Sequence, residues 1–156
     1  RKCQNKQAIK KSGCLYIIIR TAWLYSGYGH NFVKTISRLA SERDELNVVN
    51  DQWGTPTYAG DLAEAIISIM ERDDLPELEG VYHFTNEGAC TWYDFAKEIV
   101  AFTGANCKVN PVTTEEYPSK VKRPAYSILD KTKIKETFDL EIRDWREALK
   151  SCMATF

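Results

Sequence analysis

The chain has 156 residues, the usual size of one domain, and folding could bury roughly 70% of the surface that the unfolded chain exposes. Its 21 basic and 22 acidic residues nearly balance, and no basic run is interleaved with aromatic residues as in proteins that follow a phosphate backbone. No apolar run approaches the roughly 20 residues needed to cross a bilayer. These properties argue against nucleic acid and against a membrane as partners.

The cysteines are odd in number, widely scattered and never in a Cys-x-x-Cys pair: Cys3, Cys14, Cys90, Cys107 and Cys152. This pattern favours reduced thiols, and hence a cytoplasmic location, over a disulfide framework or a zinc site. His30 and His83 each lack a second ligand at metal-binding spacing. We therefore predict no metal centre built on histidine or cysteine.

The first part of the chain predicts a helix followed by a strand. Residues 2–11 are typical of the end of a helix, which Ser12 and Gly13 would close. Residues 14–21, CLYIIIRT, form the continuous apolar run of a strand covered on both faces. A helix, a glycine stop and a buried strand make half of a β-α-β unit, so we expect the partner strands to lie outside this sequence.

A glycine-rich loop comes next, and Asn31 at its end can cap a helix. The inward face of that helix has helical spacing and consists of Val33, Ile36, Leu39 and Ala40. A short strand at 45–50 and a Gly/Pro loop at 51–60 follow. The next helix, at 61–70, is expected to bury Leu62, Ala65, Ile66 and Ile69.

The second half begins with a strand at 80–86. Thr91 and Asp94 have the spacing of a capping box for a helix that ends at Gly104 and buries Trp92, Phe95, Ala96, Ile99 and Val100. Residues 107–130 predict a proline-punctuated loop with short strand pieces, and helices at 131–138 and 143–156 complete the chain. The order predicts a mixed α/β fold.

Familiar catalytic motifs are missing from the sequence. There is no Gly-x-Gly-x-x-Gly after a strand, no Walker loop and no Gly-x-Ser-x-Gly. We therefore expect this chain alone to be inactive as a dehydrogenase.

Two segments have side chains suited to binding. The loop from Thr21 to Asn31 carries Trp23, Tyr25, Ser26 and Tyr28, which together suit a sugar or a base. Alternatively, Trp23 and Tyr25 are only the end of a buried strand. The segment KVKRP presents Arg123, whose guanidinium could hold a phosphate through two hydrogen bonds, with Lys120 and Lys122 as point charges. Alternatively, these cations are only solvated.

Four motifs in register resemble the C-terminal part of the dTDP-4-dehydrorhamnose reductase family, which belongs to the extended short-chain dehydrogenases. They are RTAWLYSGYGHNFVKTISRLA, VVNDQWGTPTYAGDLA, GVYHFTNEGACTWYDFAKEI, and RPAYSILD followed by DWREALK. The resemblance covers the chain from about residue 6 to residue 154. It implies the last parallel strands of a Rossmann-like lobe at residues 1–30 and a small α/β lobe for a nucleotide-sugar at residues 31–156.

The resemblance also implies roles for single residues. Trp23 would line the deoxysugar site, with Tyr25 in the same loop, and Asn31 would lie near the nucleotide-sugar. Gln52 belongs to a loop that would pack beside this pocket, and Arg123 would meet the diphosphate.

Lys2 matches the family's catalytic lysine by its distance from Trp23, and its tyrosine partner would lie upstream of this chain. The family reduces dTDP-4-dehydro-L-rhamnose with NADPH or NADH, which the missing N-terminal part would mainly bind, and Mg²⁺ and a homodimer are further expectations. Two alternatives stay open: a nucleotide-sugar epimerase or dehydratase of the same superfamily, and a non-catalytic regulatory subunit with a reductase-like fold.

Overall fold

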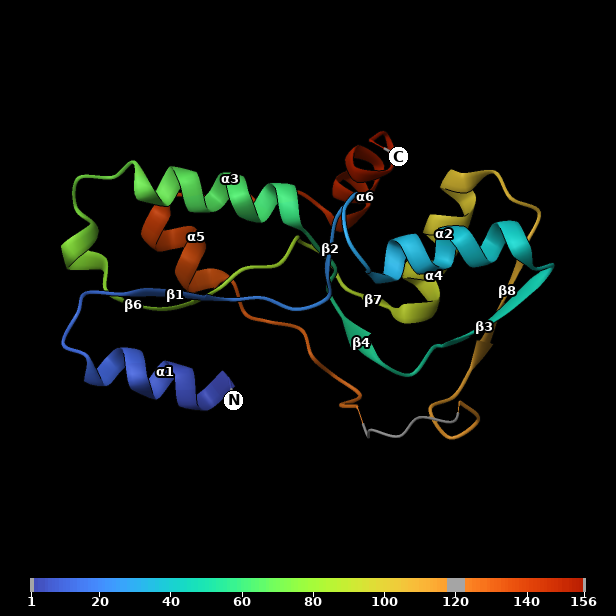
Figure 1. Cartoon of the computed structure of the whole chain (residues 1–156), viewed down its shortest axis with the longest axis horizontal. Helices are drawn as coiled ribbons and strands as arrows, with labels where there is room; N and C mark the ends of the chain where they lie inside the picture. The colour runs from blue at the N-terminus through green and yellow to red at the C-terminus, as the bar shows by residue number, and fades with distance from the viewer. Residues whose placement is uncertain (1, 118–122, 156) are drawn as a thin grey trace.

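The computed structural model describes residues 2–117 and 123–155, with side chains described from residue 7 onward. Figure 1 shows an elongated molecule in which α3, α5, β1 and β6 lie toward one end and α2, α4, β3 and β8 toward the other. The helices are α1 (Lys2–Lys11), α2 (Phe32–Glu42), α3 (Ala59–Met70), α4 (Trp92–Thr103), α5 (Thr132–Phe138) and α6 (Trp145–Met153), with a 3₁₀ helix η1 (Leu75–Leu78).

The strands of the described residues form four pairs. Three pairs are parallel, β1 (Ile17–Arg20) with β6 (Gly80–His83), β2 (Leu24–Tyr25) with β5 (Thr57–Tyr58), and β3 (Glu45–Val49) with β8 (Lys108–Val112). The fourth, β4 (Trp53–Gly54) with β7 (Cys90–Thr91), is antiparallel. The predicted α/β class with parallel strands is thus confirmed.

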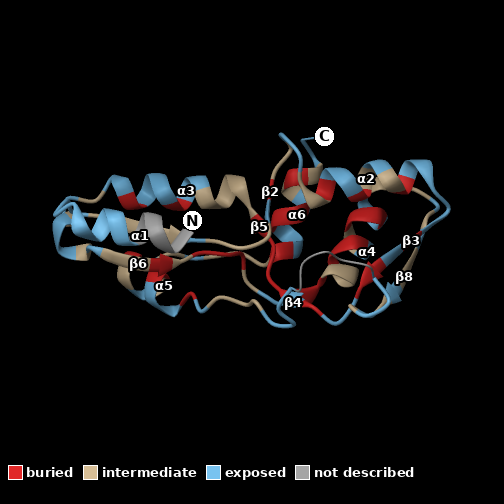
Figure 2. Ribbon diagram, turned by 60° about the horizontal axis from the view of Figure 1, so that its bottom comes forward, coloured by how far each residue is buried: buried red, intermediate tan, exposed pale blue. Residues whose placement is uncertain are grey.

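Two hydrophobic clusters hold these elements. The first joins α2, α4, α6 and β3, and its fully buried members include Val33, Phe95, Ile99, Trp145 and Leu149. The second joins α3, α5 and β6, with Ile69, Tyr82, Phe84, Ile134 and Phe138. Figure 2 shows the buried residues on the inward faces of these helices, while the outer face of α3 is exposed.

The local signals for helix ends are confirmed. Asn31 caps α2, and its side chain accepts a hydrogen bond from the Lys34 backbone N–H. Thr91 and Asp94 form the expected capping box at α4, and Gly104 ends that helix with φ +67°. Gly13 after α1 has φ +72°, the left-handed conformation that glycine adopts without steric cost.

Three predictions about nonlocal packing were wrong. The partner of β1 lies within this sequence, because β6 pairs with it from Ile17–Gly80 to Arg20–His83. β1 is also only half-buried over its isoleucines rather than fully covered. Ile66 is 37% exposed instead of buried, since α3 turns Ala65 and Ile69 inward.

The region after α4 is more regular than expected. β8 is a full five-residue strand parallel to β3 although it contains Pro111. Proline is tolerated on an edge strand, and in the described residues β8 has β3 as its neighbour on one side only. Likewise, the loop at 51–60 contains the two-residue strands β4 and β5.

The division into lobes at residue 30 stays a prediction. Each hydrophobic cluster draws on segments far apart in sequence, since Ile17 and Ile19 of β1 pack with residues of α3, β6 and α5. Within the described residues, no helix is both long enough and apolar enough to cross a membrane.

Candidate functional site

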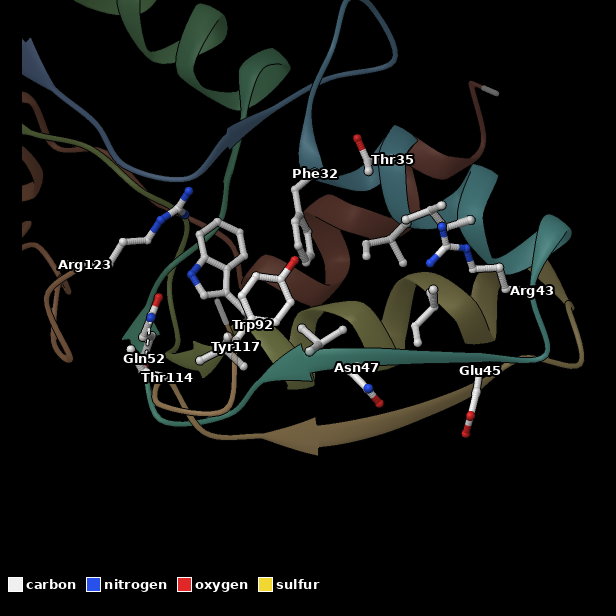
Figure 3. Close-up of a pocket in the computed structure, with 15 residues that line it drawn as sticks. Phe32, Thr35, Arg43, Glu45, Asn47, Gln52, Trp92, Thr114, Tyr117 and Arg123 are labelled. Atoms are coloured by element: carbon white, nitrogen blue, oxygen red, sulfur yellow. Dashed lines mark hydrogen bonds between the residues drawn. The ribbon is translucent and has the colours of Figure 1, made fainter. Parts of the chain in front are cut away.

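A cavity of about 550 Å³ lies between α2 and β3 (Figure 3). Phe32 and Ile36 of α2, Val48 of β3 and Trp92 of α4 give it apolar and aromatic walls. Its volume falls within the range of small-molecule sites, which are mostly apolar with a few polar groups that fix the ligand. The cavity is therefore the candidate binding site.

Two guanidinium groups mark the ends of this cavity. Arg123 lies at one end and Arg43, just after α2, at the other (Figure 3). Arg123 is exposed, so its charge is available to an incoming anion. Lys120 and Lys122, proposed from sequence beside it, lie outside the described residues.

A hydrogen-bond network holds Gln52 at the end of the cavity where Arg123 lies. Its side-chain amide donates to the hydroxyl of Thr114 at 3.0 Å, and Gln52 is only 7% exposed. The Thr114 hydroxyl in turn donates to Asp51 at 2.6 Å, and its backbone N–H donates to the same carboxylate at 2.9 Å. These hydrogen bonds from Thr114 hold the pKa of Asp51 below its ordinary value. The network therefore joins the segment after β3 to the segment after β8.

Trp23 is not among the described side chains that line the cavity, but it contacts one of them, Trp92. Its indole stacks on Trp92 with ring centroids 3.6 Å apart and planes 15° apart. Trp92 also packs against Phe32, with centroids 4.6 Å apart. The structure therefore brings Trp23 into contact with the cavity wall, not with the cavity itself.

Tyr25 belongs to the core. It is 2% exposed, and its ring packs against Tyr58 and Phe95. Its hydroxyl has no hydrogen-bond partner among the described residues, and burial raises the pKa of this phenol well above its ordinary value. Of the two readings of Tyr25, the structure favours the end of a buried strand, and the substrate-binding role stays an untested prediction.

Asn31 uses its side chain to shape the loop. The amide oxygen caps α2, and the amide nitrogen donates to the carbonyls of Ser26 and Tyr28 at 2.8 and 3.3 Å. This cap sets the start of α2 and so places Phe32 beside Trp92. Contact between Asn31 and a ligand stays a prediction.

The remaining predicted residue, Lys2, begins α1, but its side chain lies outside the part that the structure describes. Its catalytic role stays a prediction. Among the described residues, no group of three or more His, Cys, Asp or Glu is arranged to hold a metal ion.

Sequence reasoning missed several cavity residues. Trp92 was assigned to the buried face of α4, whereas it is half-buried and lines the cavity. The available signal was its place directly after the N-cap Thr91, where a side chain projects from the start of a helix. Thr114 and Tyr117 had no such signal, because only the pairing of β8 with β3 brings their segment to Gln52.

Comparison with known proteins gives consistent matches. A family described as RmlD substrate binding domain matches residues 1–156. A dTDP-4-dehydrorhamnose reductase of Aggregatibacter actinomycetemcomitans is 47% identical over 148 residues, covering 88% of this chain and 50% of the relative. The spore coat polysaccharide biosynthesis protein SpsK of Bacillus subtilis is 47% identical over 133 residues, covering 85% of this chain and 45% of the relative.

Among solved structures, the chain is similar to dTDP-4-dehydrorhamnose reductase of Bacillus anthracis in complex with NADP. The TM-score is 0.92 at 39% identity, over 99% of this chain and 54% of that one. The chain thus spans about half the length of the relatives that it matches.

Proposed function

Because this chain belongs to the RmlD substrate binding domain family, we propose that it is the nucleotide-sugar-binding part of a dTDP-4-dehydrorhamnose reductase. The complete enzyme would reduce dTDP-4-dehydro-L-rhamnose to dTDP-L-rhamnose with NADPH or NADH, for polysaccharide biosynthesis. The part of the complete enzyme upstream of this chain would supply the hydride site and the catalytic tyrosine. The present chain holds and orients the dTDP-sugar.

One observation carries the proposal: an aromatic cavity lined at one end by an exposed guanidinium, that of Arg123, and by the fixed amide of Gln52. A thymine base needs an apolar, aromatic wall, which Phe32 and Trp92 offer. A diphosphate needs a cation, and Arg123 presents a planar group that can make two parallel hydrogen bonds to it. Gln52, fixed by Thr114, adds a polar group of defined orientation.

The residues present do not form a dinucleotide site by themselves. The turn between β2 and α2 contains Gly27 and Gly29, but the position where a dinucleotide loop carries its third glycine holds Phe32. Phe32 packs on Trp92 instead of leaving room for a pyrophosphate. We therefore assign the nicotinamide cofactor, which the Bacillus anthracis relative binds as NADP, to the part of the enzyme outside this chain.

The proposal has further parts. They are a Rossmann-like segment at 1–30, a nucleotide-sugar lobe at 31–156, a cytoplasmic location and a homodimer. A Mg²⁺ requirement also stays a prediction for the complete enzyme.

The decisive experiment compares two proteins in one assay. The complete protein should consume NADPH with dTDP-4-dehydro-L-rhamnose, whereas the 156-residue chain should not, because half of each site is missing. Arg123→Ala in the complete protein should raise KM for the dTDP-sugar about tenfold through loss of a charged hydrogen-bond donor. Robust turnover by the 156-residue chain, or no turnover by the complete protein, would contradict the proposal.

Each alternative makes a different prediction. An epimerase or dehydratase of the same superfamily would convert another nucleotide-sugar in a substrate panel and leave the added NADPH unconsumed. A regulatory subunit would lack Tyr-x-x-x-Lys and a glycine-rich loop in the upstream sequence. The 47% identity to a named reductase favours the reductase over both.

A further inference from the structure

Trp23 is held by three residues that lie far from it in sequence: Trp92 and Gly54 contact its indole, and Thr57 bonds its backbone. Trp92 stacks on one face at 3.6 Å between ring centroids. Gly54 of β4 lies so close that a Cβ added there would be 2.4 Å from Cε2 of Trp23. Thr57 fastens the backbone, because its N–H donates to the Trp23 carbonyl at 3.1 Å and its hydroxyl donates to the Ala22 carbonyl at 2.6 Å.

This position forces Trp23 into an unusual backbone conformation. Its φ is +48°, which is a genuine outlier for a bulky residue. Such strain persists only where the surroundings determine the conformation, and it is concentrated at ligand-binding and active sites. The strain and the close approach of Gly54 are independent observations, and both indicate that the orientation of the Trp23 indole is under tight control.

Trp92 is itself rigidly placed. It is the first residue of α4, directly after the N-cap Thr91, which is 1% exposed and forms the capping box with Asp94. The Thr91 hydroxyl also lies 2.9 Å from Oδ1 of Asn50, at the end of β3. These hydrogen bonds fix the backbone at the start of α4, where Trp92 lies. The Trp92 side chain lines the cavity and also stacks on Trp23.

We propose that Trp92 is a positioning residue, which orients the indole of Trp23 toward the sugar of the bound nucleotide and links that indole to the occupied cavity. This inference rests on the proposed function, because it requires a chain that binds the dTDP-sugar, and the family resemblance places Trp23 at the deoxysugar. Trp92 covers one face of Trp23, so a ligand can meet only the remaining face or the ring edge. The stack would thereby determine which face or edge of the Trp23 indole contacts the sugar.

The first test detects the stacking of the two indoles directly and needs no enzymatic activity. Two stacked indoles give an exciton couplet in far-ultraviolet circular dichroism, and we expect Trp92→Phe and Trp23→Phe each to abolish it in the 156-residue chain. Trp53→Phe is the matched control, because Trp53 is adjacent to Gly54 in sequence but 44% exposed, and the couplet should persist. Gly54→Ala should weaken the couplet by displacing the Trp23 ring, which provides a second route if Trp92→Phe fails to fold. A couplet that survives both Trp92→Phe and Gly54→Ala would overturn the proposal.

The second test measures coupling in the complete protein with a double-mutant cycle. Trp92→Phe should raise KM for the dTDP-sugar about tenfold with little change in KM for NADPH. In a Trp23→Phe background the same substitution should raise this KM clearly less than tenfold, because its effect through Trp23 is already gone and only its own contact with the cavity is lost. Independent, multiplying effects would overturn the proposal. If the complete protein reduces no dTDP-sugar at all, the proposed function fails, while the couplet still decides whether Trp92 holds Trp23.

Discussion

Arg143 donates two hydrogen bonds to the carboxylate of Asp61, from Nε at 2.9 Å and from Nη2 at 2.5 Å. Asp61 lies in the first turn of α3, and its side chain is only 10% exposed. The side-chain amide of Asn86 donates to the same carboxylate. Since α3 packs in one hydrophobic cluster and α6, just after Arg143, in the other, this ion pair connects the two halves of the molecule.

Arg143→Lys is expected to destabilise the chain by about 2 kcal/mol. Lysine keeps the charge but cannot reproduce the two parallel hydrogen bonds, which leaves a nearly buried carboxylate poorly satisfied. Arg146→Lys is the matched control, because Arg146 is 54% exposed and its contact with Glu98 is 3.5 Å, so it should change stability by less than about 0.5 kcal/mol. Urea unfolding of both variants checks this, and equal destabilisation would contradict the role assigned to Arg143.

Thr114→Val should weaken binding of the dTDP-sugar to the complete protein about tenfold. The substitution keeps the shape but removes the hydroxyl that accepts from Gln52 and donates to Asp51, so the Gln52 amide loses its fixed orientation. Thr113→Val is the control, since Thr113 bonds Glu116 on the neighbouring turn instead. Calorimetric titration with the dTDP-sugar measures both, and unchanged affinity in Thr114→Val would remove Gln52 and Thr114 from the site.

The pH dependence of stability should contain a contribution from Glu87. Burial by itself raises the pKa of this carboxyl, but the hydrogen bond from Lys135 and the charges of Lys131 and Lys135 outweigh it, so the pKa lies below the ordinary 4.5. A depressed folded-state pKa gives stability that is present above pH 4.5 and is lost as the pH falls through the folded value.

Glu87→Gln should remove this acid-sensitive contribution and lower stability near neutral pH by about 2 kcal/mol, because Lys131, whose side chain is 9% exposed, loses its carboxylate at 3.4 Å. Glu136→Gln is the charge-matched control, because Glu136 is an exposed residue of α5, the helix that contains Lys135. Unfolding curves at a series of pH values test this. A Glu87→Gln variant that keeps the full acid sensitivity would refute the prediction.

Two cysteines should resist thiol reagents in the folded chain. Burial raises the pKa of Cys90 to about 12 and that of Cys152 to about 11, so almost no reactive thiolate is present at about pH 8. Cys14 is exposed and should be modified first. Mass spectrometry of peptides after timed labelling, with a denatured sample as the control, reports each site. Native labelling of Cys90 as fast as that of Cys14 would contradict the burial of Cys90.

The predicted site was recovered unevenly from the sequence. Arg123 and Gln52 line one cavity, and their contacts with a nucleotide-sugar stay predictions. Trp23 contacts that cavity only through Trp92, and Tyr25 lies in the core. The residue types at the loop were informative about binding, but whether each side chain points into a cavity depends on segments more than 60 residues away, such as α4.

What the sequence alone determined is local: the Asn31 cap, the Thr91 and Asp94 capping box and the glycine stop at Gly104 all involve groups within a few residues of each other. These hydrogen bonds join groups that the local sequence places within a few residues of each other, so residue type and spacing are enough to predict them. The tertiary structure decided the pairing of β1 with β6, the outward turn of Ile66 and the stack of Trp23 on Trp92. Those contacts join surfaces distant in sequence, and only burial of both partners together makes them favourable.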